Sequence, residues 1–216
     1  MLTLAFRGPP RRPLNLLCVG AHCDDIEIGC GAALMRLARD RPIHVTWVVL
    51  CSTPERAREV KASATLFLRG TKTRRLLIEK FRDGFLPASW AEVKEHFERL
   101  KALTSPDIIF THERDDRHQD HRIVNELTWN TFRDHFILEY EIPKYDGMSG
   151  QPNFYVPAAA SIARRKSRIL CAAYKSQQSR AWFSEETFQG LMRLRGIECN
   201  ADEGYAEAFY CRKIRI

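Results

Sequence analysis

Three short apolar runs, separated by segments with helical spacing, constrain most strongly what this chain folds into. The runs cover residues 14–19, 43–50 and 107–111, and their nearly continuous apolar character predicts strands that are covered on both faces. Helices are predicted between and after these runs, over residues 29–38, 54–68, 89–103 and 123–136. This alternation predicts an α/β fold: a three-layer, Rossmann-like domain with a mostly parallel sheet and helices on both faces.

The length of the chain fits one domain. It has 216 residues, of which 44% are hydrophobic and 28% are charged, a balance that excludes a disordered or collagen-like chain. We therefore predict a single domain over residues 1–216. No apolar run is long enough to cross a membrane and no signal peptide is recognisable, so neither feature is expected. Seven cysteines without a CxxC pair predict reduced thiols and a cytoplasmic location.

The positive charge of the chain is concentrated in one segment. Residues 56–82, called here the basic stretch, carry nine basic and two acidic side chains, an excess equal to the formal net charge of +7. Nucleic acid, an anionic membrane surface or a phosphorylated small molecule would each be attracted to such a segment, and a solvated helix face would also explain it.

Two groups of histidines and acidic residues directly follow two of the predicted strands. Residues 21–27 (AHCDDIE) follow the first strand, and residues 111–121 (THERDDRHQDH) follow the third; together they hold four of the seven histidines. Because ligands bind at the carboxyl ends of strands in open α/β sheets, the two groups are expected to form one site. Gly29 and Gly31 are better explained by packing of a helix against a strand than by phosphate binding, because the third glycine of that motif is missing.

The residue types in the two groups are those of a catalytic zinc site. Such a site needs three protein ligands from imidazole and carboxylate groups and keeps one position for water. His22, Asp25 and His121 can supply that set. Consecutive side chains in an extended loop diverge, so that one of Asp24 and Asp25 can bind the metal while the other acts as a base toward the attacking water.

Several assignments stay open at this point. His118 and His121 share a helix face, so that one can bind the metal and the other can point toward substrate. Asp120 can orient a histidine. His112 has no assigned role, and Cys23 is close enough to the first group to be a soft ligand. The other three histidines fall in predicted strands or helices and are expected to be structural: His44, His96 and His135.

At these residues the chain resembles the LmbE-like, or PIG-L-like, family of zinc-dependent N-deacetylases, which remove acetyl groups from substrates that contain N-acetylglucosamine. The family's Ala-His-Pro-Asp-Asp motif followed by Glu is similar to residues 21–27, and its His-Pro-Asp-His motif is similar to residues 118–121. Shorter matches lie at Arg56-x-x-Glu59, Asp83-Gly84, Ser176-Gln177 and residues 205–209. The resemblance implies that His22, Asp25 and His121 bind the metal.

The same resemblance implies the catalytic roles. Asp24 matches the family's general base, and His118 matches the histidine that stabilises the oxyanion or protonates the leaving amine, with Asp120 beside it. Cys23 and Gln119 replace the prolines of the two motifs, which removes no reactive group. These matches lead to the hypothesis of metal-assisted hydrolysis of an acetamide on an amino sugar, with one Zn²⁺ per chain as the cofactor.

The substrate is predicted from residues outside the two motifs. The segment 140–157 is expected to be a long loop, and its polar and aromatic residues Tyr145, Asp146 and Asn153 are of the kind that line sugar sites. Arg56 is predicted to bind substrate because it opens a helix at the carboxyl end of a strand. If the basic stretch reaches the site, it favours a soluble, anionic N-acetylhexosamine derivative. The sequence leaves open whether the chain forms a homo-oligomer.

Two other classes of function are compatible with parts of the sequence. His22, Asp24 and His121 also fit the two-histidine, one-carboxylate triad of non-haem iron oxygenases, whose sites usually sit on antiparallel barrels. A module that binds nucleic acid through the basic stretch is the non-enzymatic alternative. Aromatic residues suited to base stacking are sparse there, being only Phe67 and Phe81, so nucleic acid is not the expected partner.

Overall fold

Seven strands form one sheet in the computed structural model, which describes residues 12–71, 73–147 and 150–215. The strands are β1 (Leu14–Gly20), β2 (Ile43–Cys51), β3 (Thr73–Phe81), β4 (Ile108–His112), β5 (Ile137–Tyr140), β6 (Phe154–Ala158) and β7 (Tyr205–Cys211). Their order in the sheet is β3-β2-β1-β4-β5-β7-β6. The first five strands in this order run parallel, whereas β7 is antiparallel to both β5 and β6. The predicted α/β fold with a mostly parallel sheet is confirmed; the ends of the range 1–216 lie outside the described residues.

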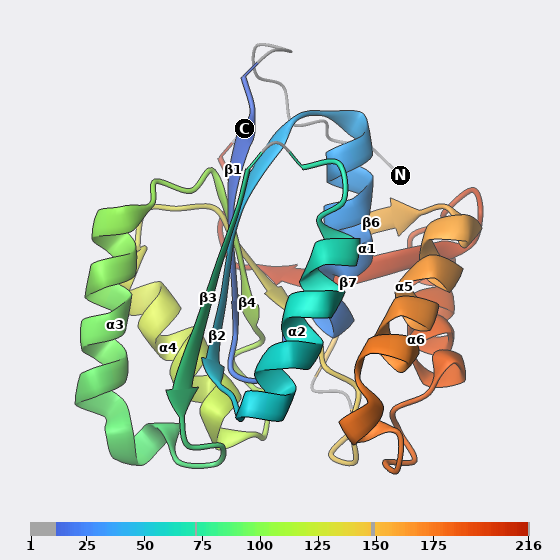
Figure 1. Ribbon diagram of the computed structural model, residues 1–216. Helices are drawn as coiled ribbons and strands as arrows, with labels where there is room; N and C mark the ends of the chain where they lie inside the picture. Colours follow the sequence, from blue (N-terminus) through green and yellow to red (C-terminus); the bar gives the residue numbers. More distant parts are fainter. Residues whose placement is uncertain (1–11, 72, 148–149, 216) are drawn as a thin grey trace.

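Helices cover both faces of this sheet. Within the described residues they are α1 (Asp25–Asp40), α2 (Pro54–Phe67), α3 (Trp90–Leu103), α4 (Gln119–Thr131), α5 (Ala160–Ala173) and α6 (Glu185–Glu198). Short 3-10 helices occupy Leu86–Ser89 and Lys175–Gln177. Helices α3 and α4 lie on one side of the strands, and α1, α2, α5 and α6 lie on the other (Figure 1). The molecule therefore has the three layers expected from the alternation of strands and helices.

The order of the strands reverses between β1 and β4. Strand β1 pairs with β2 on one side and with β4 on the other. The chain leaves β1 into α1 and leaves β4 into α4, and these two helices lie on opposite faces of the sheet (Figure 1). Ligands in open α/β sheets bind at such a reversal of strand order, outside the carboxyl ends of the strands. Both groups of histidines and acidic residues follow these two strands.

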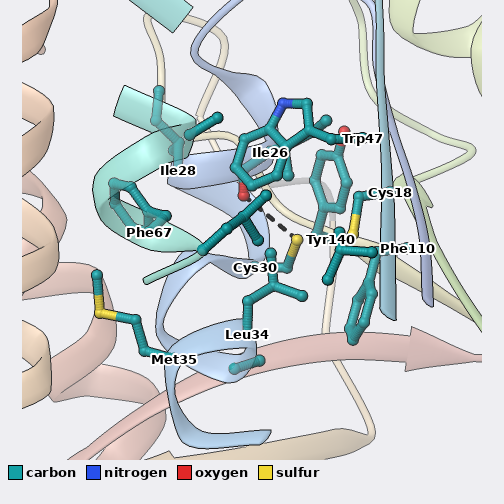
Figure 2. Packing of buried hydrophobic residues seen from close by; sticks show 14 of the residues in the cluster. Cys18, Ile26, Ile28, Cys30, Leu34, Met35, Trp47, Phe67, Phe110 and Tyr140 are labelled. Carbon is teal, nitrogen blue, oxygen red and sulfur yellow. Dashed lines mark hydrogen bonds between the residues drawn. The ribbon is translucent and has the colours of Figure 1, made fainter. Parts of the chain in front are cut away.

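Helix α1 packs closely against its neighbours because two of its residues are glycines, which have no side chain. A Cβ atom on Gly29 would lie 2.2 Å from the Tyr140 ring, and one on Gly31 would lie 2.5 Å from the Phe67 ring. Figure 2 shows Tyr140 and Phe67 beside the helix, together with the buried Trp47. Gly29 thus packs helix α1 against a strand, as predicted, whereas Gly31 packs it against helix α2 rather than against a strand.

Four details of the sequence-based prediction were wrong. Helix α1 begins at Asp25 rather than at residue 29, and α4 covers residues 119–131 rather than 123–136, because the polar residues of each motif themselves form the first turn. The segment 140–157 is not all loop, since β6 occupies its end. His135 lies after α4 and not within a helix.

Two further points concern segments that were not assigned or not confirmed. Strands β3, β5 and β7 and helices α5 and α6 were not assigned from the sequence, and β3 lies inside the basic stretch. Among the described helices, none has both the length and the apolar character needed to span a bilayer.

Candidate functional site

The two groups of residues meet where β1 and β4 end. The Ala21 carbonyl accepts a hydrogen bond from the Cys51 amide at 2.7 Å, which fixes the turn after β1 to the end of β2. The next amide, of His22, donates to Asp25 Oδ2 at 2.6 Å. On the other side, His118 is the N-cap of α4. We call the buried or half-buried residues that converge here the His/Asp cluster: His22, Asp25, His112, Asp116, His118, Asp120 and His121.

The three predicted metal ligands face one another within this cluster. His22 Nδ1 lies 3.1 Å from His121 Nε2 and 3.4 Å from Asp25 Oδ2. The other oxygen of Asp25, Oδ1, lies 3.6 Å from His121 Nε2. Ligands of a tetrahedral zinc ion are separated by about 3.3 Å when their bonds to the metal have ordinary lengths. The three side chains therefore fit such an ion in chemical type and in spacing.

The second nitrogen of each of these histidines faces a carboxylate. His121 Nδ1 lies 2.9 Å from Asp116 Oδ2, and His22 Nε2 lies 3.0 Å from Asp83 Oδ1 and 3.4 Å from Asp120 Oδ2. A carboxylate at one ring nitrogen holds the proton there and leaves the lone pair of the other nitrogen for a metal. The arrangement thus aims His22 Nδ1 and His121 Nε2 at the same point.

The charges of the cluster support the same interpretation. Burial, reinforced by the neighbouring His112, lowers the pKa of His121 to about 3, so this ring is neutral and its lone pair is available. Burial would raise the pKa of Asp25, but His121, His112 and His22 outweigh it and lower that pKa well below its ordinary value. For His22, burial acts to lower the pKa, and Asp25 and Asp120 more than reverse this effect. Asp25 is therefore held as an anion among imidazoles.

His112, which the sequence left without a role, is part of the cluster. Its ring stacks on that of His121 with centroids 3.8 Å apart. Its Nε2 lies 3.1 Å from Asp25 Oδ2 and accepts the Ala21 amide at 3.0 Å. Since this hydrogen bond already uses the Nε2 lone pair, His112 acts here as a neighbour of the ligand set that fixes the turn after β1.

Asp24 lies beside the ligand set and pairs with Arg56. Arg56 Nη2 donates to Asp24 Oδ1 at 2.6 Å, and the guanidinium also binds Glu59 and Ser176. The guanidinium carbon lies 5.0 Å from the centre of the Tyr174 ring. Burial raises the pKa of Asp24, and Arg56 opposes that effect. The structure thus brings two of the predicted site residues into direct contact.

His118 and Asp120 are fixed by the first turn of α4. His118 Nδ1 accepts the Asp120 amide at 3.2 Å, and burial together with His22 lowers the pKa of His118. A neutral ring that accepts at Nδ1 carries its proton on Nε2. The Asp120 carboxylate accepts the amides of Gly84 at 2.6 Å and Leu86 at 3.1 Å. Asp120 is therefore anchored to the loop after β3 and faces His22 rather than the His118 ring.

The two positions where the chain departs from the motif prolines face away from the ligand set. The Cys23 thiol donates to the Cys51 carbonyl at 3.6 Å, and burial raises its pKa to about 12. A thiol in that state does not favour metal binding. Gln119 donates to the Gly84 carbonyl at 3.1 Å, which ties α4 to the same loop that holds Asp120.

The other predicted substrate residues are not in described contact with the His/Asp cluster. Tyr145 is 75% exposed. Asp146 lines a surface depression that is also lined by Asp116 and Lys144. Asn153 holds the start of β6 to the end of β7, since its amide donates to the Cys211 carbonyl and its Oδ1 accepts the Cys211 amide. A substrate-binding role for Tyr145, Asp146 and Asn153 stays a prediction.

Sequence reasoning assigned no role to Asp83, Asp116 or Lys144. Asp116 stands five residues before His121 within the second motif, a spacing that pointed to no particular contact. Asp83 belongs to a matched dipeptide, but only the fold brings it to His22. Lys144 lies in a loop and carried no sequence signal.

Comparison with known proteins identifies relatives over most of the chain. The PIG-L family, GlcNAc-PI de-N-acetylase, matches residues 17–132. The chain is 30% identical over 194 residues to the uncharacterized deacetylase YaiS of Escherichia coli (strain K12), covering 83% of this chain and 98% of that protein. The family match extends through both histidine-containing motifs.

Solved structures share the fold. The conserved protein TT1542 from Thermus thermophilus has a TM-score of 0.71 at 23% identity, covering 94% of this chain and 96% of its own. The N,N'-diacetylchitobiose deacetylase from Pyrococcus horikoshii has a TM-score of 0.69 at 21% identity, covering 90% and 82%. The matched family and the parallel sheet give no support to the oxygenase or nucleic-acid alternatives.

Proposed function

Because the chain belongs to the PIG-L family of de-N-acetylases, we propose that it is a zinc-dependent hydrolase that removes the acetyl group from an N-acetylated amino sugar. The observation that carries the proposal is the convergence of His22 Nδ1, His121 Nε2 and the Asp25 carboxylate at 3.1–3.6 Å from one another. Their other ring nitrogens face carboxylates, which orient both rings toward this point, and a metal would displace the proton that His22 holds in its absence.

A zinc ion bound by His22, Asp25 and His121 would supply Lewis acidity toward water and the amide carbonyl. The protein's own groups then move the protons. Asp24 accepts a proton from the attacking water, and Arg56 at 2.6 Å holds this carboxylate in place and favours its charged form. A base fixed in this way loses little entropy when it meets the water.

His118 is proposed to act on the substrate oxygen, whereas Asp24 acts on the attacking water. Its Nδ1 accepts the Asp120 amide, which leaves a proton on Nε2. That proton can form a hydrogen bond to the tetrahedral oxyanion, while the proton that Asp24 takes from the water passes to the leaving amine. Asp120 contributes by orienting His22 through Nε2 at 3.4 Å.

The substrate proposed is a soluble, anionic N-acetylhexosamine derivative. Arg82 and Arg117 are exposed next to the two loops of the site, and the Arg82 guanidinium carbon stands 3.5 Å from the centre of the Phe85 ring. Phe85 is 44% exposed, so a ring and a cation are both accessible beside Asp83. An aromatic face suits a sugar ring and a guanidinium suits a phosphate. Tyr145, Asp146 and Asn153 are proposed to contact more distant parts of this substrate.

The location of the protein is proposed from its thiols. All seven cysteines are free, which supports a reducing compartment such as the cytoplasm. We propose that residues 1–216 act there as one catalytic domain.

The test is release of free amine by the zinc-loaded protein from N-acetylglucosamine, its phosphate, its nucleotide conjugate and neutral N-acetylated glycosides. Asp24→Asn should retain zinc and lower kcat by about 10²–10⁴-fold, because the base is lost while the donor set is kept. Asp40→Asn, at the other end of the same helix α1, is the matched control and should turn over like the wild type.

Each outcome decides one part of the proposal. Equal turnover by Asp24→Asn would remove Asp24 from the mechanism. A preference for neutral glycosides would reject the anionic substrate. Absence of amine release from every compound, with zinc bound, would overturn deacetylation of amino sugars.

A further inference from the structure

Lys144, which lies outside both motifs, contacts Asp116, and Asp116 contacts the predicted metal ligand His121. Lys144 lies in the loop between β5 and β6, and its Nζ lies 2.7 Å from Asp116 Oδ1 and 2.6 Å from Asp116 Oδ2. The lysine side chain is 14% exposed and that of Asp116 is 6% exposed. A pair this well shielded from water is far stronger than one on the surface.

Asp116 in turn fixes both histidines of the second motif. Its Oδ2 lies 2.9 Å from His121 Nδ1, and its Oδ1 accepts the His118 amide at 2.8 Å. The orientation of this one carboxylate therefore sets the rotation of the His121 ring. It also sets where His121 Nε2 points.

The two carboxylates that orient the metal-binding histidines are held in different ways. Asp120, which faces His22, accepts two backbone amides, from Gly84 and Leu86, and the Cys51 thiol lies 4.0 Å from its Oδ2. Asp116 accepts one backbone amide, that of His118. The remaining restraint on its rotation, apart from His121 itself, comes from Lys144 in a separate loop.

We propose that Lys144 is a positioning residue of the metal site, which holds Asp116 so that His121 presents Nε2 to the donor set formed with His22 and Asp25. Without the ammonium group, the Asp116 carboxylate can turn about its last side-chain torsion, which has a broad energy minimum. The bond to His121 Nδ1 then weakens, and the His121 ring no longer keeps its nitrogen within 3.1 Å of His22 Nδ1. The inference rests on the proposed metal site, but not on the identity of the substrate.

The experiment measures zinc affinity by competition with a chromophoric chelator, together with the visible spectrum of the cobalt(II)-substituted protein. Lys144→Met should lower zinc affinity by about 10-fold, the lower end of what loss of a direct partner of a metal-binding histidine costs, and should change the cobalt spectrum. Lys144→Arg keeps the charge and should restore both. Lys94→Met is the matched control, since Lys94 pairs with Glu98 and with Thr131 at the far end of α4 from His118 and His121, and should bind zinc like the wild type.

The outcomes separate this inference from the proposed function. Zinc affinity of Lys144→Met within twofold of the wild type would overturn the positioning role, whatever the enzyme hydrolyses. An equal loss in Lys144→Met and Lys94→Met, or no recovery in Lys144→Arg, would also overturn it. If the wild type binds zinc but releases no amine, the proposed reaction fails while the role of Lys144 is still supported by a loss of affinity in Lys144→Met.

Discussion

Two sets of buried charged groups contact helix α1, and they differ in whether hydrogen bonds within the protein satisfy them. We call Lys166 and Glu207 the closed set and the His/Asp cluster the open set. In the middle of the helix, Lys166 donates to the Ile28 carbonyl and to Glu207, and Glu207 also accepts the amides of Ala32 and Ala33. Both oxygens of Glu207 are paired, and the pair joins α5 and β7 to α1.

The His/Asp cluster at the first turn of the same helix is different. His22 Nδ1 and His121 Nε2 face each other at 3.1 Å, a distance that leaves room for one proton between them, and their other nitrogens face carboxylates. Both sets bury charge, so burial of charge alone does not mark a functional site. What distinguishes the cluster is that its donor atoms converge on one point and are not all satisfied by the protein.

The largest effect on stability is expected in the closed set. Lys166→Met leaves the Glu207 carboxylate buried without its cation, and breaking such a pair costs about 3–5 kcal/mol. We expect urea unfolding to show this loss in the free energy of unfolding, while the folded protein keeps its zinc affinity. The added change Glu207→Gln removes the uncompensated charge and should recover part of the stability.

Lys94→Met is the control for that prediction. Its side chain pairs with the half-exposed Glu98, and an exposed pair of this kind contributes little to stability. If Lys166→Met lost no more stability than Lys94→Met, the Lys166–Glu207 pair would not be a main support of α1.

The His/Asp cluster should increase the free energy of unfolding only when metal is added. Zinc at 100 times its dissociation constant should raise the free energy of unfolding of the wild type by about 2.7 kcal/mol, because it binds the folded state. His121→Ala removes one donor and should lose this gain. His135→Ala, outside the cluster, should keep it. A zinc-dependent gain in His121→Ala equal to that of the wild type would exclude His121 from the donor set.

The parts of the fold that the sequence predicted are those whose pattern is local. Strands β1, β2 and β4 are continuous apolar runs, as expected for strands covered on both faces. Strand β3 was missed because it lies at the edge of the sheet and carries charged residues such as Arg75 and Lys80. Charged side chains on an edge strand discourage pairing with other chains, and they hide the strand from an apolar pattern.

The site residues, too, differ in whether a local sequence pattern indicates them. His22, Asp25 and His121 belong to motifs at the ends of two adjacent parallel strands, so topology alone brought them together. Lys144 reaches Asp116 from a loop 28 residues further along the chain, and no spacing rule connects them. Contacts of this kind depend on how the loop between β5 and β6 packs, which a single lysine in a sequence does not reveal.

A smaller effect on stability is expected from a third buried group, Glu27, which lies on α1 between the open and closed sets. The Tyr174 hydroxyl lies 2.5 Å from Glu27 Oε1 and 2.6 Å from the Cys23 carbonyl. One hydroxyl hydrogen cannot serve both acceptors, so a protonated Glu27 that donates to Tyr174 completes the hydrogen bonds. Burial is the main cause that raises the pKa of Glu27 to about 8.

This pKa makes the stability of the metal-free protein depend on pH in a defined direction. Between the ordinary carboxyl pKa of 4.5 and about 8, folded Glu27 keeps its proton while the unfolded chain has lost it, so unfolding releases a proton and stability falls as pH rises. We expect the wild type to lose about 1–2 kcal/mol relative to Glu27→Gln between pH 6 and 8, measured by urea unfolding at a series of pH values. Glu95→Gln, an exposed change on α3, should keep the wild-type pH dependence. Parallel pH profiles for the wild type and Glu27→Gln would mean that folded Glu27 is charged, and α1 would then carry a second open set of buried charge beside the His/Asp cluster.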